Sequence, residues 1–198
     1  MPSSRNPKFQ RQMNRSDSTT DSKDCGPRTI QMGIDALTMG EKVPSIETIR
    51  KKMGRQGNQT TNTSDAKKCV ESYTSQAMGN KRNALKYARY TGVQHQDILD
   101  DAAKRGEYIQ LCIDYGKFND ATGKKTGDPN FRGGHSVGVF GWRQLDDGTI
   151  QWKLWDPLDD KRRSGIPQGP RWVKKAHLMA AWKSFGGYFG ILRGGQKK

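Results

Sequence analysis

Hydrophobic positions follow two different spacings in the two halves of the chain. From Pro27 to Arg105, apolar residues recur every three or four positions, which is the spacing of helices with one buried face. From Glu107 to Leu192 they mostly alternate with polar residues, as they do along half-buried strands. Helices followed by an antiparallel meander predict an α+β domain.

Five helical segments are expected in the first half. Ile30, Ile34 and Leu37 fall on one face of a helix over Pro27–Met39, and Pro27 suits a first helical turn. The other four are expected to open at Pro44-Ser45, to be capped by Ser64 or Asp65, and to cover Asn83–Tyr90 and Gln96–Arg105.

The second half predicts four strands and one more helix. The strands are expected over Glu107–Tyr115, His135–Trp142, Ile150–Trp155 and Tyr188–Leu192, and the helix over Trp172–Phe185. A turn is expected at Asp146–Thr149. Gly116–Gly134 is expected to be a long loop, and loops of that length in a compact domain are often functional.

Length and charge add a domain boundary and a class of partner. The 198 residues suit one domain, expected over residues 23–195, and residues 1–22 are expected to be a flexible basic arm that could dock to an assembly. The net charge of +15 favours polyanionic partners. The basic residues are spread along the chain, so nucleic acid is expected as a partner by charge alone.

Three cysteines at wide spacing, Cys25, Cys69 and Cys112, predict neither a disulfide framework nor a zinc site. No metal or other cofactor is expected. The polar start of the chain predicts no signal peptide, and no stretch is apolar enough to cross a membrane. We therefore expect a cytoplasmic protein, or one delivered within an assembly such as a virion.

Candidate chemistry begins at Asp24-Cys25-Gly26-Pro27. A cysteine at a helix start gains from the positive end of the helix dipole, which lowers the thiol pKa and yields a nucleophilic thiolate. His135 opens a strand after two glycines, and Asp156 ends the next strand. Cysteine, histidine and acid are the groups of a thiol hydrolase. Cys69 and Cys112 are expected to be ordinary residues of a helix and a strand.

A hairpin brings the start of its first strand beside the end of its second, so His135 and Asp156 should meet. A tight turn at Asp147-Gly148 would pair Asp156 with Val139, which leaves it a few residues from His135. A looser loop, or a bulge at Gly138 or Gly141, would close that difference. Asp159, farther along, is the reserve acid.

These motifs resemble the papain-like cysteine peptidases, in particular the group that processes bacteriocin leaders. The matching residues are Asp24-Cys25-Gly26-Pro27, Gly134-His135-Ser136-Val137-Gly138-Val139 and Asp156-Pro157. The resemblance implies a helical half packed on an antiparallel sheet, with the site in the cleft between them. It also implies that Cys25 is the nucleophile, His135 the base and then the acid, and Asp156 the residue that orients the imidazole.

The sequence departs from that family at one position. The family usually has a glutamine six residues before the cysteine, as an oxyanion donor, and here that residue is Thr19. Removing one such donor typically lowers the rate by about 10²–10³-fold. Thr19, Ser22 or the backbone N–H of Cys25 could replace it, and Gln12 is a more distant candidate.

Two functions follow from this pattern. The first is a cysteine peptidase or amidase that cleaves a peptide, or a peptidoglycan-type stem peptide, through a thioester. The alternative is a weak or inactive papain-like fold that serves as a structural component of a larger assembly such as a phage particle, anchored by residues 1–22. Neither function requires a membrane.

Overall fold

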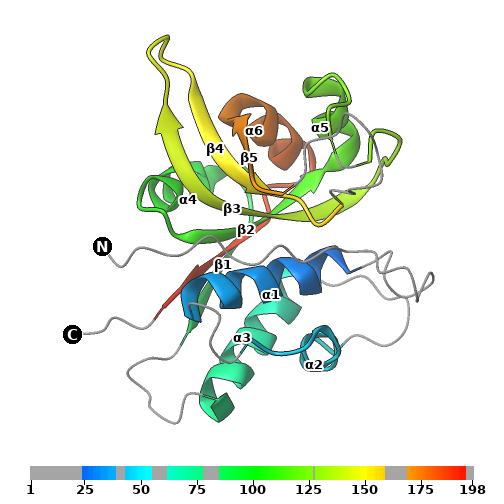
Figure 1. The fold of residues 1–198 in the computed structure, drawn as a ribbon, viewed down its shortest axis with the longest axis vertical. Helices are drawn as coiled ribbons and strands as arrows, with labels where there is room; N and C mark the ends of the chain where they lie inside the picture. The colour runs from blue at the N-terminus through cyan, green and yellow to red at the C-terminus, as the bar shows by residue number, and fades with distance from the viewer. Residues whose placement is uncertain are drawn as a thin grey trace.

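The chain folds around one antiparallel sheet (Figure 1). The computed structural model describes residues 24–38, 43–54, 62–77, 85–126, 128–158 and 169–194. Over these residues the sheet has six strands in the order β1-β6-β2-β3-β4-β5. The strands are β1 (Lys86–Tyr90), β2 (Tyr108–Asp114), β3 (Gly134–Gln144), β4 (Ile150–Trp155), β5 (Arg171–Lys174) and β6 (Phe189–Arg193).

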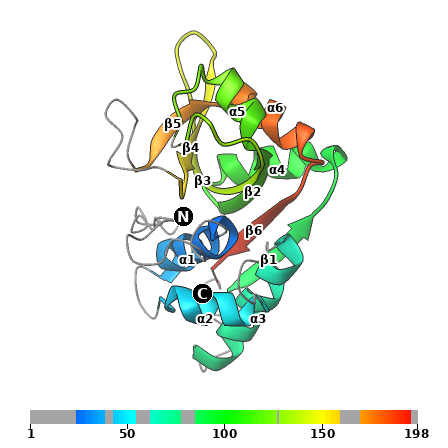
Figure 2. The same cartoon turned by 90° about the vertical axis from the view of Figure 1, so that its right-hand side faces the viewer.

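Helices cover both faces of this sheet (Figures 1 and 2). One face carries α1 (Cys25–Thr38), α2 (Ile46–Lys52) and α3 (Thr63–Ala77). The other carries α4 (Gln96–Lys104), α5 (Tyr115–Ala121) and α6 (Lys175–Ser184). The predicted α+β class, with an N-terminal helical half against an antiparallel sheet, is confirmed.

Helix α1 lies at the centre of the first face and is buried on nearly every side. It is enclosed by the sheet, α2 and α3, and its residues from Gly26 to Ala36 are all buried. Gly33 lets the helix approach the sheet, because a Cβ there would lie 2.7 Å from the ring of Tyr108. A helix buried all round cannot shift easily. Its first residue, Cys25, therefore has a fixed position relative to the strands.

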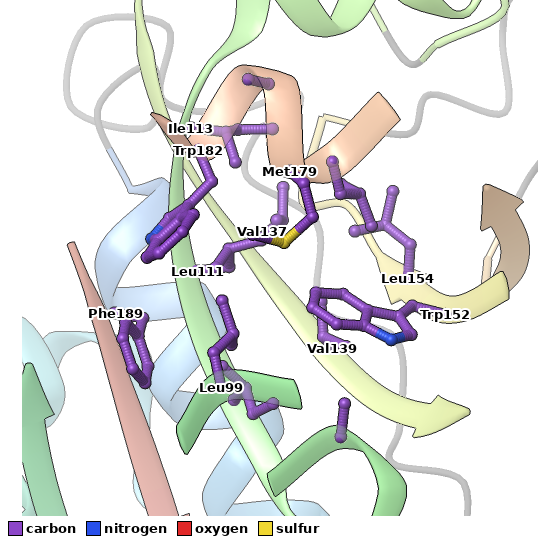
Figure 3. Close-up of a cluster of buried hydrophobic side chains, with 14 of the residues drawn as sticks. Leu99, Leu111, Ile113, Val137, Val139, Trp152, Leu154, Met179, Trp182 and Phe189 are labelled. Carbon is purple, nitrogen blue, oxygen red and sulfur yellow. The ribbon is translucent and has the colours of Figure 1, made fainter. Parts of the chain in front are cut away.

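The second face has its own apolar core (Figure 3). Alternate residues of β2 and β3, among them Leu111 and Val137, point into it and meet Trp182 of α6 and Trp152 of β4. The alternation predicted for these strands is therefore the pattern of a sheet with a different core on each face. His135 lies on the same face as Val137 and so at the end of this core.

Two predicted helices contain strands instead. Lys86–Tyr90 is β1, since it pairs with β6 and buries Tyr87, whose hydroxyl donates to Gln110 at 2.6 Å. Arg171–Lys174 is β5, because it pairs with β4, and the expected helix begins only at Lys175. In both places pairing with a neighbouring strand overrides a local helical pattern.

The expected loop Gly116–Gly134 contains a helix at its start. Tyr115–Ala121 is α5, which is capped by Asp114, whose carboxylate accepts from the N–H of Lys117 at 3.1 Å. Residues 1–22 lie outside the described residues, so the expected arm stays a prediction. Within the described part of the chain, no helix is long and apolar enough to cross a bilayer.

Candidate active site

Cys25 is the first residue of α1, and the residue before it is anchored from two sides. The carbonyl of Asp24 accepts the first helical hydrogen bond, from the N–H of Arg28 at 2.8 Å. The carboxylate of Asp24 is fully buried and forms a bidentate ion pair with Arg50 of α2, with one bond of 3.0 Å from Nε. The pair neutralises a negative charge that would otherwise oppose a thiolate one residue away.

His135 and Asp156 meet through a hairpin that is looser than a minimal one. Gly148, at a φ of +78°, closes the turn, and its N–H donates to the carbonyl of Leu145. Near this turn Trp142 pairs with Trp152. The pairing of β3 with β4 then shifts between Trp142 and Val139, so that Val139 pairs with Leu154. The irregularity includes Gly141, one of the two predicted bulge positions.

This register brings Asp156 nearer to His135 than a tight turn would. Continued past the end of β4, it places Asp156 opposite Val137 rather than Val139. His135 is then a diagonal neighbour on the same face, within reach of a side-chain contact. Nε2 of His135 lies 2.8 Å from Oδ1 of Asp156.

Asp156 is fully buried and every described contact of its two oxygens is with a donor. Oδ1 accepts from His135 and, at 2.9 Å, from the N–H of Leu158. Oδ2 accepts from the hydroxyl of Tyr115 at 2.5 Å and lies 3.4 Å from Nη2 of Arg171. A carboxylate with such donors is held in its ionised form. Burial alone would raise the pKa of Asp156, but His135 and Arg171 lower it to about 2.

The same pair keeps the imidazole protonated. Burial opposes a charge on His135, but the negative charge of Asp156 and hydrogen bonds to Asp156 and Cys25 raise the pKa of His135 to about 9. Since Asp156 occupies Nε2, Nδ1 is the ring nitrogen left for the thiol. Tyr115 packs edge-on against the ring, with centroids 4.8 Å apart, and limits its rotation.

Cys25 is partly exposed, yet its environment favours the thiolate. Burial acts to raise its pKa, but the hydrogen bond and charge of His135 and the backbone N–H groups of Ser136 and Gly26 lower it. The other two cysteines behave oppositely. Burial raises the pKa of Cys69 to about 11, and burial with the nearby charge of Cys25 raises that of Cys112 to about 12.

The structure thus brings Cys25, His135 and Asp156 together in one network. Thr19 and Ser22, the predicted oxyanion donors, and Asp159, the reserve acid, lie outside the described residues. Sequence reasoning missed Tyr115 and Arg171, which contact Asp156 from α5 and β5. Neither carries a local signal, because Tyr115 only ends the expected strand Glu107–Tyr115 and Arg171 precedes the expected helix Trp172–Phe185.

The comparisons with known proteins bear on the fold. No family model matches the chain, and no curated protein does. Solved structures do match it, among them two at 14% sequence identity. The peptidase domain of Streptococcus ComA, a bi-functional ABC transporter of a quorum-sensing pathway, has a TM-score of 0.55 over 93% of this chain and 96% of its own. A second structure, described as that of a C39-like peptidase from Bacillus anthracis, has a TM-score of 0.60 over 96% of this chain and 95% of its own. The chain therefore has the papain-like fold of the C39 peptidase domains, which is the resemblance that its three motifs carry.

Proposed function

We propose that the protein is a cysteine peptidase or amidase in which Cys25 attacks a peptide carbonyl and His135 and Asp156 assist. One observation carries this proposal. A thiol with a lowered pKa at the start of α1 shares a hydrogen bond with an imidazole, and that imidazole is bonded at 2.8 Å to a buried carboxylate. This arrangement places a thiolate on Cys25 beside a protonated imidazole on His135.

The reaction needs no group from outside the chain except water. The sulfur of Cys25 bonds to the carbonyl carbon, and the carbonyl oxygen takes the negative charge. As the C–N bond breaks, the imidazolium of His135 gives its proton to the leaving amine. Neutral His135 then takes a proton from water, whose oxygen attacks the thioester and releases the acid and the Cys25 thiolate. Asp156 holds the ring in place throughout.

Stabilising the oxyanion is the step in which the family uses a glutamine that this sequence lacks at the matching position, Thr19. We propose that the backbone N–H of Cys25 is one donor, because it points from the free N-terminal end of α1. Thr19 and Ser22 are the proposed side-chain donors.

Thiol labelling tests the proposal without a known substrate. We expect iodoacetamide to alkylate Cys25 at least 10-fold faster than Cys69 or Cys112 at pH 7, because only Cys25 has a lowered pKa. His135→Ala should remove that advantage. Peptide mapping by mass spectrometry gives the three rates in one sample. His177→Ala, which changes a histidine of α6 outside this network, is the matched control.

Two outcomes would contradict the proposal. One is equal labelling of the three cysteines, and the other is a Cys25 rate that does not change in His135→Ala. Either would favour the alternative, a papain-like fold used as a structural component. In that case the basic surface and residues 1–22, rather than Cys25, would carry the function.

A further inference from the structure

Two of the three cysteines lie on the same face of the sheet. Along β2, Leu111 and Ile113 belong to the core beneath α4 and α6, so Cys112 between them turns to the opposite face, which α1 covers. Cys25 is the first residue of that helix. Both thiols are free and partly exposed, whereas Cys69 is buried in α3. Cys25 and Cys112 are therefore the two cysteines that can react with each other and with a small reagent from solvent.

One residue of β3, Ser136, connects the two thiols. Ser136 lies opposite Cys112 in the pairing of β2 with β3, where partner side chains lie side by side. Its hydroxyl is hydrogen-bonded to the thiol of Cys112, and its N–H to the thiol of Cys25. The hydroxyl of Thr29 lies 3.0 Å from the carbonyl of Ser136 and 2.7 Å from that of Cys25, which fixes the first turn of α1 on this strand. Both sulfurs therefore contact the same residue, one from α1 and one from β2.

The charges of the two thiols oppose each other. Burial raises the pKa of Cys112 to about 12, and the nearby charge of the Cys25 thiolate acts in the same direction. Although burial also opposes a charge on Cys25, the hydrogen bond and charge of His135 lower its pKa. A reaction that removes the negative charge from Cys25 therefore makes Cys112 easier to ionise. Cys25 is the thiol that reacts first, and its neutral oxidation product favours a reaction of Cys112.

We propose that a hydroperoxide oxidises Cys25 and that Cys112 then captures the oxidised sulfur in a reversible disulfide, which switches the site off. This inference rests on the nucleophilic Cys25 of the proposed function. A thiolate that is partly exposed reacts with peroxide and, without a second thiol, goes on to the irreversible sulfinic acid. A thiol on the neighbouring strand would stop the oxidation at a stage that a reductant can reverse.

The two steps balance with hydrogen peroxide as the only co-reactant. The sulfur of the Cys25 thiolate bonds to one peroxide oxygen as the O–O bond breaks, so the sulfur loses two electrons and the peroxide gains them. The imidazolium of His135 gives its proton to the departing hydroxide, which leaves as water. The sulfur of Cys112 then bonds to the sulfenic sulfur of Cys25 as its S–O bond breaks. The hydroxide released takes the Cys112 proton and leaves as a second water.

Peroxide treatment of the full chain tests the inference. The protein is treated with hydrogen peroxide in about tenfold molar excess, the remaining thiols are blocked with N-ethylmaleimide, and non-reduced peptides are mapped by mass spectrometry. We expect a disulfide that joins the Cys25 peptide to the Cys112 peptide, and an unblocked chain lighter by two hydrogen atoms. Iodoacetamide labelling of Cys25 should fall by about 10-fold or more and return to its starting rate after dithiothreitol.

Cys112→Ser removes the capturing thiol and keeps its size. In this variant Cys25 should gain two oxygen atoms, as the sulfinic acid, and recover less than about a tenth of its labelling rate after dithiothreitol. Before peroxide treatment it should label at Cys25 near the wild-type rate, which checks that the site is folded. Cys69→Ser, which removes the buried thiol of α3, is the matched control and should behave as the wild type.

Three outcomes would overturn the inference. In the first, oxidised wild-type Cys25 carries oxygen while Cys112 stays free, a result that needs no variant. In the second, Cys25 is linked to a cysteine of another copy, in a yield that grows with protein concentration. In the third, Cys112→Ser recovers as fully as the wild type. The reduced protein reports the proposed function separately, since fast labelling of Cys25 without a link to Cys112 would contradict the disulfide alone.

Discussion

The two faces of the sheet use polar groups in different ways. On the α1 face a chain of neutral groups crosses the sheet, in which Tyr87 donates to Gln110 and Gln110 donates to Ser136 at 2.9 Å, and the Asp24–Arg50 ion pair fixes the start of α1. On the face of α5 and α6 the apolar core ends in an ionised pair, His135 and Asp156. The proposed nucleophile lies on the first side and its proposed base on the second.

This difference separates two properties of the site, the position of the Cys25 thiol and the protonation of the groups around it. A neutral hydrogen bond stabilises a fold by about 0.5–1.5 kcal/mol and changes few charges, so the α1 face mainly determines where the thiol lies. A buried ion pair stabilises less predictably but shifts the pKa of both partners, so the α5/α6 face determines which groups carry protons. Changes on the two faces should therefore alter different observables.

The largest effect is expected on the charged face. Asp156→Asn removes the charge that keeps His135 protonated and leaves the shape of the side chain. We expect kcat/KM for peptide cleavage to fall by about 10³–10⁴-fold, as removal of the orienting acid does in other triads. Cleavage of the acetyl-Leu-Gly amide of a fluorogenic amine, followed at pH 7, measures it.

The pH profile of the same variant is more diagnostic than its rate. The pKa of His135 is raised to about 9 in the native protein, so the alkaline limb of kcat/KM should lie near pH 9. In Asp156→Asn that limb should move down from pH 9 toward the ordinary value of 6.5, because burial opposes the charge and only Cys25 is left to raise the pKa of His135. The charged imidazole stabilises the fold below pH 6.5, and this contribution is lost as the pH rises through about 9. An unmoved alkaline limb would show that His135 is not the group that titrates.

A smaller effect is expected from a positioning residue on the same face. Tyr115→Phe keeps the ring against His135 but removes the 2.5 Å hydrogen bond to Asp156. We expect the free energy of unfolding to fall by about 1.5–3 kcal/mol, since the acceptor is charged and buried. The alkaline limb should also shift, because one stabilising donor to the carboxylate is gone. Urea denaturation and the pH–rate profile measure the two changes.

Tyr108→Phe is the matched control for that change. Tyr108 is a buried tyrosine at the start of β2, and its hydroxyl donates to the carbonyl of Thr29 at 2.7 Å. Its loss should cost about 1 kcal/mol of stability and leave the alkaline limb unmoved. Equal pH shifts in the two variants would contradict the assignment of separate tasks to the two faces.

The sequence predicted much of the fold because its strong signals are local. The first helix, the central strands and the hairpin turn depend on spacing within a few residues, and His135 and Asp156 follow from the hairpin itself. The segments at Lys86–Tyr90 and Trp172–Lys174 were predicted as helix because they become strands only by pairing with β6 and β4. No local pattern records a partner that is more than a hundred residues away or beyond a long connection.

The contacts around Asp156 show the same limit within the site. The three motif residues stand out by their chemistry and neighbours, whereas Tyr115 and Arg171 are ordinary residue types in unremarkable segments. Their part becomes visible only when α5 and β5 bring them to the same carboxylate. A register shift was predicted because a tight hairpin would not bring Asp156 to His135. Its position beside Gly141, next to the Trp142–Trp152 pair, depends on how the two strands pair across the hairpin.

The smallest effect is expected where α1 joins β3 on the α1 face. The hydroxyl of Thr29 lies 2.7 Å from the carbonyl of Cys25 and 3.0 Å from that of Ser136, so it links the first turn of α1 to the strand of His135. Thr29→Val preserves the shape and removes this link. We expect a loss of about 1 kcal/mol in stability and a fall of kcat/KM of roughly 10-fold, since small displacements of reacting groups lower rates.

Thr38→Val distinguishes the link to β3 from an effect on the helix alone. Thr38 makes the same kind of bond within α1, to the carbonyl of Ile34 at 2.8 Å, but lies at the far end of the helix from Cys25. It should leave kcat/KM unchanged. In Thr29→Val the alkaline limb should stay near pH 9, because His135 and Asp156 keep their contact while the thiol moves relative to them. If that limb moved as it does in Asp156→Asn, the α1 face would also determine which groups carry protons, and position and protonation would not be separable in this fold.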